Sequence, residues 1–402
     1  MIAVVKVVMN FEWSREKRTF LYFWLFGLIN NILYVVILSA ASDIIGPSLP
    51  KSIVLLFDIM PSFLIKLSAP FFIHKIHYDK RIPVLIILSV FGIMLVSTRK
   101  LWLCLPGIVL ASLSSGFGEI TFLQLTHFFG SRSLTGWSSG TGGAGIVGSF
   151  SYLLLTTFLR LNIQVSLMLY ALLLFFFLLY FNVNDEIYAS QNYQSLEVPI
   201  EEDGIASSED PIQILKPDHW NHTLKRLSQL VVPYMIPLST VYLFEYLINQ
   251  GVALTLLFPI DKTPFVKYRD IYVTYGTLYQ LGVFVSRTWG HLLPVKNLYV
   301  FSILQFINLA VTICQSYFYF THSMWLLMII IFYEGLIGGS SYVNCFMNIL
   351  KNVDPKEREF SLGSVSISDS SGTLISAFLG IYLEPTLCKH QVDTGRPWCR
   401  ME

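Results

Sequence analysis

The sequence predicts an all-α, polytopic transmembrane protein, and its composition and charge pattern both support this fold class. Of its 402 residues, 54% are hydrophobic and only 13% are charged, whereas a soluble domain has about 25% charged residues. The charged residues avoid long apolar stretches and gather between them. An apolar run of about 18 or more residues is typical of a transmembrane helix, and a bilayer can solvate such a surface.

We predict about eleven transmembrane helices, arranged as six plus five. The first six are expected at residues 20–42, 52–73, 82–98, 102–125, 135–159 and 163–182. The last five are expected at residues 230–254, 270–290, 297–319, 323–348 and 362–383. These helices form an N-terminal six-helix bundle at 20–182 and a C-terminal five-helix bundle at 230–384.

An acidic connection at residues 183–229 separates the two bundles. It has few large apolar residues, so we predict a solvated cytosolic linker. Residues 193–196 (YQSL) and 210–215 (DPIQIL) resemble short sorting signals, which makes sorting adaptors candidate partners of this linker.

The distribution of Lys and Arg predicts the orientation in the membrane. These residues are more frequent in the loops on the side of the N-terminus, so residues 1–19 are expected in the cytosol. An odd number of helices then places the tail at 385–402 in the lumen. Because a lumen is more oxidising than the cytosol, Cys388 and Cys399 in this tail could form a disulfide. Two free thiols are the alternative.

Two short motifs recur six helices apart. Residues 28–31 (LINN) resemble residues 247–250 (LINQ), and the SSGT of residues 138–141 recurs at 370–373. Two six-helix halves in parallel order are the plan of the major facilitator fold. We therefore predict this fold, with the last helix of the second half missing.

Small residues recur at every fourth position of the helix expected at 135–159, namely Gly136, Gly140, Ala144 and Gly148. This spacing favours the close approach of a neighbouring helix. The glycine-rich residues 140–145 could instead suggest a phosphate-binding loop, but no strand precedes them and no Lys-Ser/Thr pair follows.

Ionisable residues inside predicted helices are costly in a membrane and indicate function. Glu119 and Glu334 lie in equivalent helices of the two halves, and Lys66 and Arg287 lie in another equivalent pair. We predict a central polar site in which acids and bases face each other and buried carboxyl groups exchange protons. The candidate substrate- or proton-binding residues are Glu119, Glu245, Arg287, Glu334, Asp369, Lys66 and Asn30, and Asp58 is a further intramembrane acid.

Two purely structural roles are alternatives to this functional interpretation. The charged residues could form structural ion pairs between helices, and the bases near helix ends could extend to the membrane interface. The excess of acids over bases inside the predicted helices favours protons or a cationic solute.

No metal site, cofactor or catalytic residue is predicted. The pairs His74/His77 and His219/His222 lack a third ligand, and no hydrolase signature is present, so we do not expect an enzyme. A net charge of +1 gives no general attraction to nucleic acid. The expected partners are the lipid bilayer, a small-molecule solute and protons.

The sequence resembles the battenin family of lysosomal and vacuolar membrane proteins, and it looks like a fungal member. The resemblance is carried by residues 23–28 (FWLFGL), 30–31, 34–36, 118–123 (GEITFL), 138–145, 245–251 (EYLINQG), 286–287, 333–336 (YEGL), 338–339 and 342–344. It implies a major facilitator-like fold and roles in lumenal pH homeostasis and solute movement. In this family, fungal members are associated with basic amino acids, notably arginine, and animal members with glycerophosphodiester export.

The predicted function is therefore a multi-pass, proton-linked secondary transporter of the vacuolar membrane. It would contribute to vacuolar pH homeostasis and to the transport of basic amino acids such as arginine. The alternatives are a glycerophosphodiester exporter and a non-transporting scaffold that regulates pH through the proton pump.

Overall fold

The computed structural model describes residues 15–45, 51–98, 100–183 and 218–400, and within these residues the chain is helical and has no strand. The first half contains α2 (Arg15–Ile45), α3 (Lys51–Ser68), α4 (Tyr78–Ser97), α5 (Leu101–Leu153), α6 (Ile163–Leu173) and η5 (Leu174–Leu179). The second half contains α8 (Asp218–Leu230), η6 (Val231–Met235), α9 (Ile236–Leu247), η7 (Ile248–Val252), α10 (Tyr268–Trp289), α11 (Tyr299–Phe318), α12 (Met324–Asn352), α13 (Pro355–Val365) and α14 (Ile367–Asp393).

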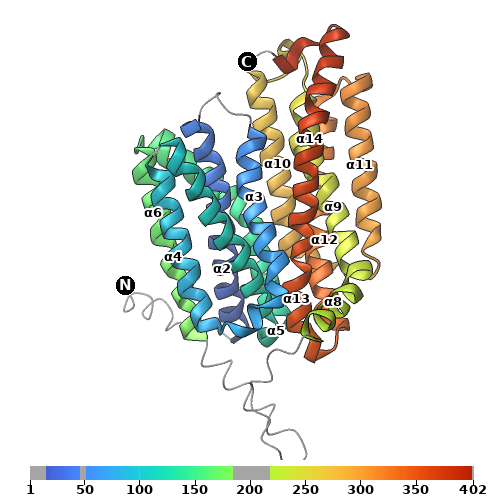
Figure 1. Ribbon diagram of the computed structural model, residues 1–402. Helices are drawn as coiled ribbons and strands as arrows, with labels where there is room; N and C mark the ends of the chain where they lie inside the picture. The colour runs from blue at the N-terminus through green and yellow to red at the C-terminus, as the bar shows by residue number, and fades with distance from the viewer. Residues whose placement is uncertain (1–14, 46–50, 99, 184–217, 401–402) are drawn as a thin grey trace, which may run out of the picture.

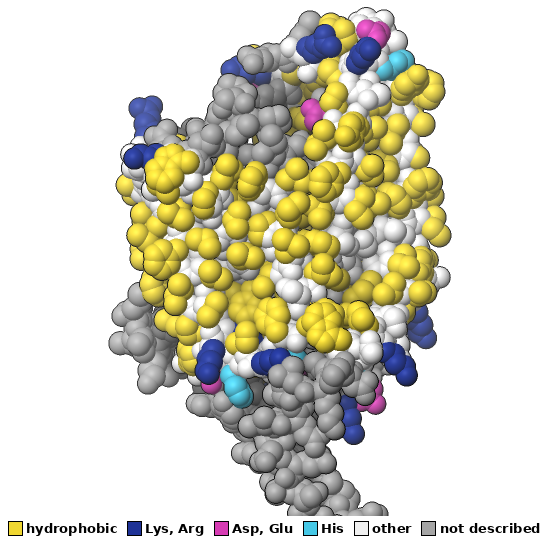
Figure 2. Space-filling model, in the orientation of Figure 1, with side chains coloured by type: hydrophobic (Ala, Val, Ile, Leu, Met, Phe, Trp, Pro, Cys, Tyr) yellow, Lys and Arg dark blue, Asp and Glu magenta, His cyan; other side chains and the backbone are white. Residues whose placement is uncertain are grey.

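The two halves stand side by side as roughly parallel bundles (Figure 1). They touch through α3 against α14 and through α5 against α10 and α12. Hydrophobic side chains cover the middle of the visible face, and Lys and Arg lie toward its two ends (Figure 2). This distribution is the one expected of a protein embedded in a bilayer.

Each predicted membrane helix lies largely in helical structure, but the breaks differ in detail. Two of the predicted helices fall within α5, which turns sharply at Gly130, where φ is 69°. A glycine adopts such a backbone angle without a steric penalty. By length and hydropathy, six helical segments of the described chain could cross a membrane, and one of them contains this kink. The number of eleven therefore stays a prediction.

The predicted linker ends earlier than its composition suggested. Residues 218–229 form most of α8, because tertiary contacts stabilise this polar helix. The ring of Trp220 stacks on that of Phe71, with 4.3 Å between centroids. Arg226 lies 2.6 Å from a carboxylate oxygen of Glu357 in α13 and covers the ring of Phe360. The two sorting-signal patterns lie outside the described residues.

The C-terminal part of α14 and the residues that follow it up to Cys399 pack against the second half. Helix α14 continues to Asp393, well into the predicted tail, and its end lies opposite α8 and α13 in the bundle (Figure 1). Cys388 and Cys399 form a disulfide with a Cα–Cα distance of 5.8 Å, so the predicted pairing is present. Gln391 donates hydrogen bonds from Nε2 to the carbonyl oxygens of Thr255 and Ser316. The side of the membrane on which this end lies stays a prediction.

The small-residue face of α5 packs against α2, as its spacing predicted. A Cβ atom added to Gly136 or Gly140 would collide with the backbone carbonyl oxygen of Phe20 or Trp24 in α2. At Gly148 an added Cβ would meet the side chain of Val35. The glycine-rich segment is therefore helical packing surface and not a loop.

We expect Gly140→Ala to lower the free energy of unfolding by about 1–3 kcal/mol, because an added methyl group meets rigid backbone and forces α2 and α5 apart. Gly276→Ala in α10 is the matched control, since no atom lies within 4 Å of an added Cβ there. Alanine favours a helix by up to about 1 kcal/mol over glycine, so this control should melt no lower than the parent. Thermal unfolding of the purified protein measures both changes, and equal melting temperatures would contradict the packing argument.

Candidate functional site

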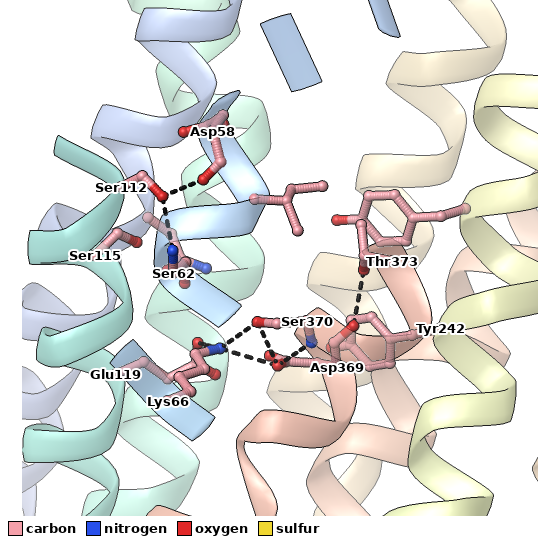
Figure 3. A pocket seen from close by; sticks show the side chains of 13 residues that line it. Asp58, Ser62, Lys66, Ser112, Ser115, Glu119, Tyr242, Asp369, Ser370 and Thr373 are labelled. Atoms are coloured by element: carbon pink, nitrogen blue, oxygen red, sulfur yellow. Dashed lines mark hydrogen bonds and ion pairs between the residues drawn. The ribbon is translucent and has the colours of Figure 1, made fainter. Parts of the chain in front are cut away.

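A polar cavity of about 110 Å³ lies between the two halves. Its walls come from α2, α3 and α5 in the first half and from α9 and α14 in the second (Figure 3). Four charged residues of the described part of the chain line it, and they are Asp58, Lys66, Glu119 and Asp369. Three of these residues are acids, so the cavity is richer in carboxylates than in cations.

Lys66 joins the two halves at this cavity. Its ammonium group lies 2.7 Å from Oε2 of Glu119 in α5 and 2.9 Å from Oδ1 of Asp369 in α14. It also donates a hydrogen bond of 2.9 Å to the hydroxyl of Ser370. The Lys66 residue is only 2% exposed, so it does not extend to the membrane interface. All three donors of the ammonium are used, which is the condition under which a buried charge is tolerated.

Arg287 also reaches across to the other half, but it finds neutral partners. Its guanidinium donates hydrogen bonds of 2.7 Å to the hydroxyls of Thr141 in α5 and Tyr242 in α9. It lies 4.1 Å from the ring centroid of Tyr342, which is a cation–π distance. Its Nε atom has no hydrogen-bond partner, and no carboxylate of the described residues is within ion-pair distance.

Tyr342 connects the Arg287 group to the Lys66 group. Its hydroxyl donates to Oε1 of Glu119 at 3.1 Å and accepts from the indole N–H of Trp137 at 3.0 Å. The aromatic ring of Tyr342 thus contacts a cation while its hydroxyl contacts an acid that pairs with the other cation. A substitution of either base therefore alters the surroundings of Tyr342, which contacts Arg287 directly and contacts the Glu119 partner of Lys66.

The contacts of the two bases mirror the internal repeat. Lys66 contacts Ser370 and Arg287 contacts Thr141, and these partners lie in the two copies of the SSGT motif. Each base therefore crosses to the repeated motif of the other half, which supports the predicted equivalence of the helices. The residue that precedes the motif is Asp369 in one copy and Trp137 in the other, and among the described residues only Lys66 has an acid partner there.

Glu245 and Glu334 form a second cluster inside the second half. Glu245 in α9 accepts a hydrogen bond from the hydroxyl of Tyr279. Asn249 donates from Nδ2 to Oε1 of Glu334 at 2.9 Å and to the carbonyl of Glu245 at 3.1 Å. Each carboxyl group keeps one buried oxygen without a partner, and neither residue lines the cavity. The predicted single site is thus divided into two clusters.

Asn30 does not line the cavity, but it contacts α5, which forms one of the cavity walls. Its amide donates to the carbonyl of Ser115 in α5 at 3.2 Å, and its side-chain oxygen fills the space beside Gly118. Ser115 lines the cavity, and Asn31 does so instead of Asn30. Asn30 therefore fixes the backbone of α5 next to Glu119.

Three contributors were missed in the sequence, namely Tyr242, Tyr342 and Ser370. Tyrosine is frequent in this chain, so no single tyrosine stands out by residue type. In the sequence, Ser370 stands out only as part of a repeat. The repeat itself was the one signal that could have connected Ser370 and Thr141 with the two bases.

Comparison with known proteins adds three findings. The family model described as "CLN3 protein" matches residues 21–390. The chain is 80% identical to Protein BTN1 of Kluyveromyces lactis and 55% identical to Protein BTN1 of Saccharomyces cerevisiae. Each of these alignments covers 97% of this chain and all of the relative.

Solved structures of transporters are similar in fold. A bacterial homologue of the iron transporter ferroportin, in an outward-facing state, gives a TM-score of 0.57 at 16% identity, with 96% of this chain and 99% of that chain covered. The proton:xylose symporter XylE of the major facilitator superfamily gives a TM-score of 0.59 at 10% identity, with coverage of 96% and 91%. These similarities show a major facilitator fold.

Proposed function

Since the chain belongs to the CLN3 protein family, as a fungal member of the battenin group, we propose that it is a secondary transporter that works by alternating access around the cavity. The observation that carries this proposal is the Lys66 ion-pair group. One ammonium is shared by an acid from each half, so relative motion of the halves must break at least one pair. A scaffold that does not move would gain little from buried charges that cost free energy to desolvate.

The charge of the cavity supports a cationic solute. Asp58, Glu119 and Asp369 face it, and Lys66 is the only base among the described residues that line it. An excess of carboxylates in a low-dielectric site favours a cation. We propose a basic amino acid such as arginine, moved across the vacuolar membrane as part of vacuolar pH homeostasis. No chemical conversion of the solute is part of this proposal.

The Glu245–Glu334 cluster supports proton coupling. Both residues are almost fully buried, at 2% and 0% exposure, and no Lys or Arg of the described residues forms an ion pair with them. Two neighbouring carboxyl groups without a counter-charge favour a shared proton. Tyr279 and Asn249 supply fixed hydrogen-bond donors, so the cluster can hold a proton at one stage of the cycle and release it at another.

Arg287 favours a second candidate, the export of a glycerophosphodiester. Its guanidinium has no acid partner among the described residues and keeps Nε unpaired. A guanidinium matches the geometry of a phosphate oxygen pair. This residue does not line the cavity, and for that reason we prefer the cationic solute.

The proposed function is tested with the purified full-length protein in sealed liposomes. We expect uptake of labelled arginine, accelerated several-fold by an imposed pH gradient and returned to the basal rate by a protonophore. Glycerophosphodiester flux in place of arginine flux would promote the second candidate. Flux of neither solute above that of empty liposomes would favour the scaffold.

A further inference from the structure

The backbone hydrogen bonding of α3 is interrupted near its middle, beside the cavity, and we call this part of the helix the opened turn. A regular α-helix joins each N–H to the carbonyl four residues earlier, but Pro61 has no N–H to donate. The hydroxyl of Ser112 in α5 accepts from the N–H of Ser62 at 3.1 Å and donates to the carbonyl of Asp58. Ser112 thus inserts between two groups that a regular helix joins directly, which is a known cause of local distortion.

The carboxyl group of Asp58 lies at this opened turn and has neither a hydrogen-bond donor nor a counter-charge among the described residues. The residue is 4% exposed and lines the cavity together with Ser62 and Ser112 (Figure 3). Its Oδ2 atom has no hydrogen-bond partner, and no Lys or Arg of the described chain pairs with its carboxylate. A buried carboxylate without a donor is costly. The cost is recovered if a ligand supplies the missing donor.

We propose that the Asp58 carboxylate binds the cationic nitrogen group of the solute, a guanidinium or an ammonium. This inference rests on the proposed function and assigns the cation-binding end of the same cavity. Lys66 lies eight residues further along α3, which corresponds to about 12 Å of helix. The cavity therefore has an acid without a partner at one end and an ammonium at the other.

The opposite end of the cavity suits an anionic group of the same solute. Every donor of Lys66 is already used by Glu119, Asp369 and Ser370. A solute carboxylate must compete with one of these acids, and Asp369 is the one that belongs to the other half. A basic amino acid, with a charged group at each end, satisfies Asp58 and weakens the ion pair between the halves in one binding event.

The side chain of Asp58 makes no structural contact with the described residues that would explain an acidic residue at this position. Its carboxylate caps no helix, because the residue lies in the interior of α3. The contact that holds α3 to α5 at this level uses the backbone carbonyl of Asp58 and not its side chain. Asp58→Asn should therefore leave this contact intact.

The test compares labelled arginine with citrulline, which carries a neutral urea in place of the guanidinium. In liposomes, we expect Asp58→Asn to raise the KM for arginine about 10- to 100-fold, the loss expected for a hydrogen bond to a charged group. The weak competition by citrulline should not change. Asp58→Glu should recover part of the affinity, and the exposed control Asp261→Asn should match the parent protein.

A binding measurement separates this inference from the proposed function. If the parent does not transport arginine but arginine raises its melting temperature and not that of Asp58→Asn, the binding site stands and the transport function fails. An equal effect of arginine on both proteins, or no effect on the parent, overturns the site. A parallel loss of affinity for arginine and citrulline in Asp58→Asn also overturns it, because Asp58 would then not recognise charge.

Discussion

Lys66→Gln should reduce solute flux to the level of empty liposomes and lower the free energy of unfolding by about 3–5 kcal/mol. The amide cannot neutralise Glu119 and Asp369, which lie 2.7 and 2.9 Å from the present ammonium. Two buried carboxylates would then face each other without a cation. Flux is measured in liposomes, and stability is measured by thermal unfolding of the purified protein.

Two controls separate charge from shape in this experiment. Lys267→Gln removes an exposed lysine at the start of α10 and should change neither flux nor stability. Lys66→Gln combined with Asp369→Asn removes one unpaired acid and should recover part of the stability but not the flux. If Lys66→Gln melts like the parent, the ion-pair group does not hold the two halves together.

Glu334→Gln should abolish the several-fold acceleration of arginine uptake by a pH gradient, because an amide cannot take up and release the coupling proton. Exchange of external for internal arginine should persist, because Glu334 does not line the cavity. Removal of the charge should also leave membrane insertion intact. Uptake with and without the gradient, and exchange without it, are measured on the same liposomes.

Arg287→Gln is the counterpart that distinguishes the two candidate solutes. If arginine is the solute, its flux should survive this change, since the guanidinium contacts Thr141 and Tyr242 and not the cavity acids. A loss of glycerophosphodiester flux in Arg287→Gln, together with unchanged behaviour of Glu334→Gln, would reverse the preferred assignment.

The apolar runs and the repeated motifs were enough to predict the fold. Lipid solvation demands long apolar helices, and charges inside them are conspicuous, so Lys66, Glu119 and Asp369 could be selected one by one. Their pairing could not be predicted, because Lys66 and Asp369 are 303 positions apart and meet only when the halves pack. The sequence of a transmembrane helix does not show whether a lysine within it has an ion-pair partner.

Other features depended on contacts that leave little trace in composition. The polar α8 is held by Trp220 on Phe71 and by Arg226 on Glu357, so its sequence resembles a solvated linker. The opened turn of α3 requires Ser112 from another helix as well as Pro61. Proline alone marks a bend in a helix but does not identify the side chain that enters it.

A membrane voltage should act unevenly on the two halves. At the cavity and around Arg287, Asp58, Lys66 and Glu119 move with the first half in the proposed cycle and together carry one negative charge when Asp58 is ionised, whereas Arg287 and Asp369 move with the second half and together carry none. A full elementary charge crossing 100 mV changes the free energy by about 2.3 kcal/mol, and a partial displacement changes it in proportion. The empty carrier would therefore have an electrically preferred orientation, and a bound cation would cancel that preference.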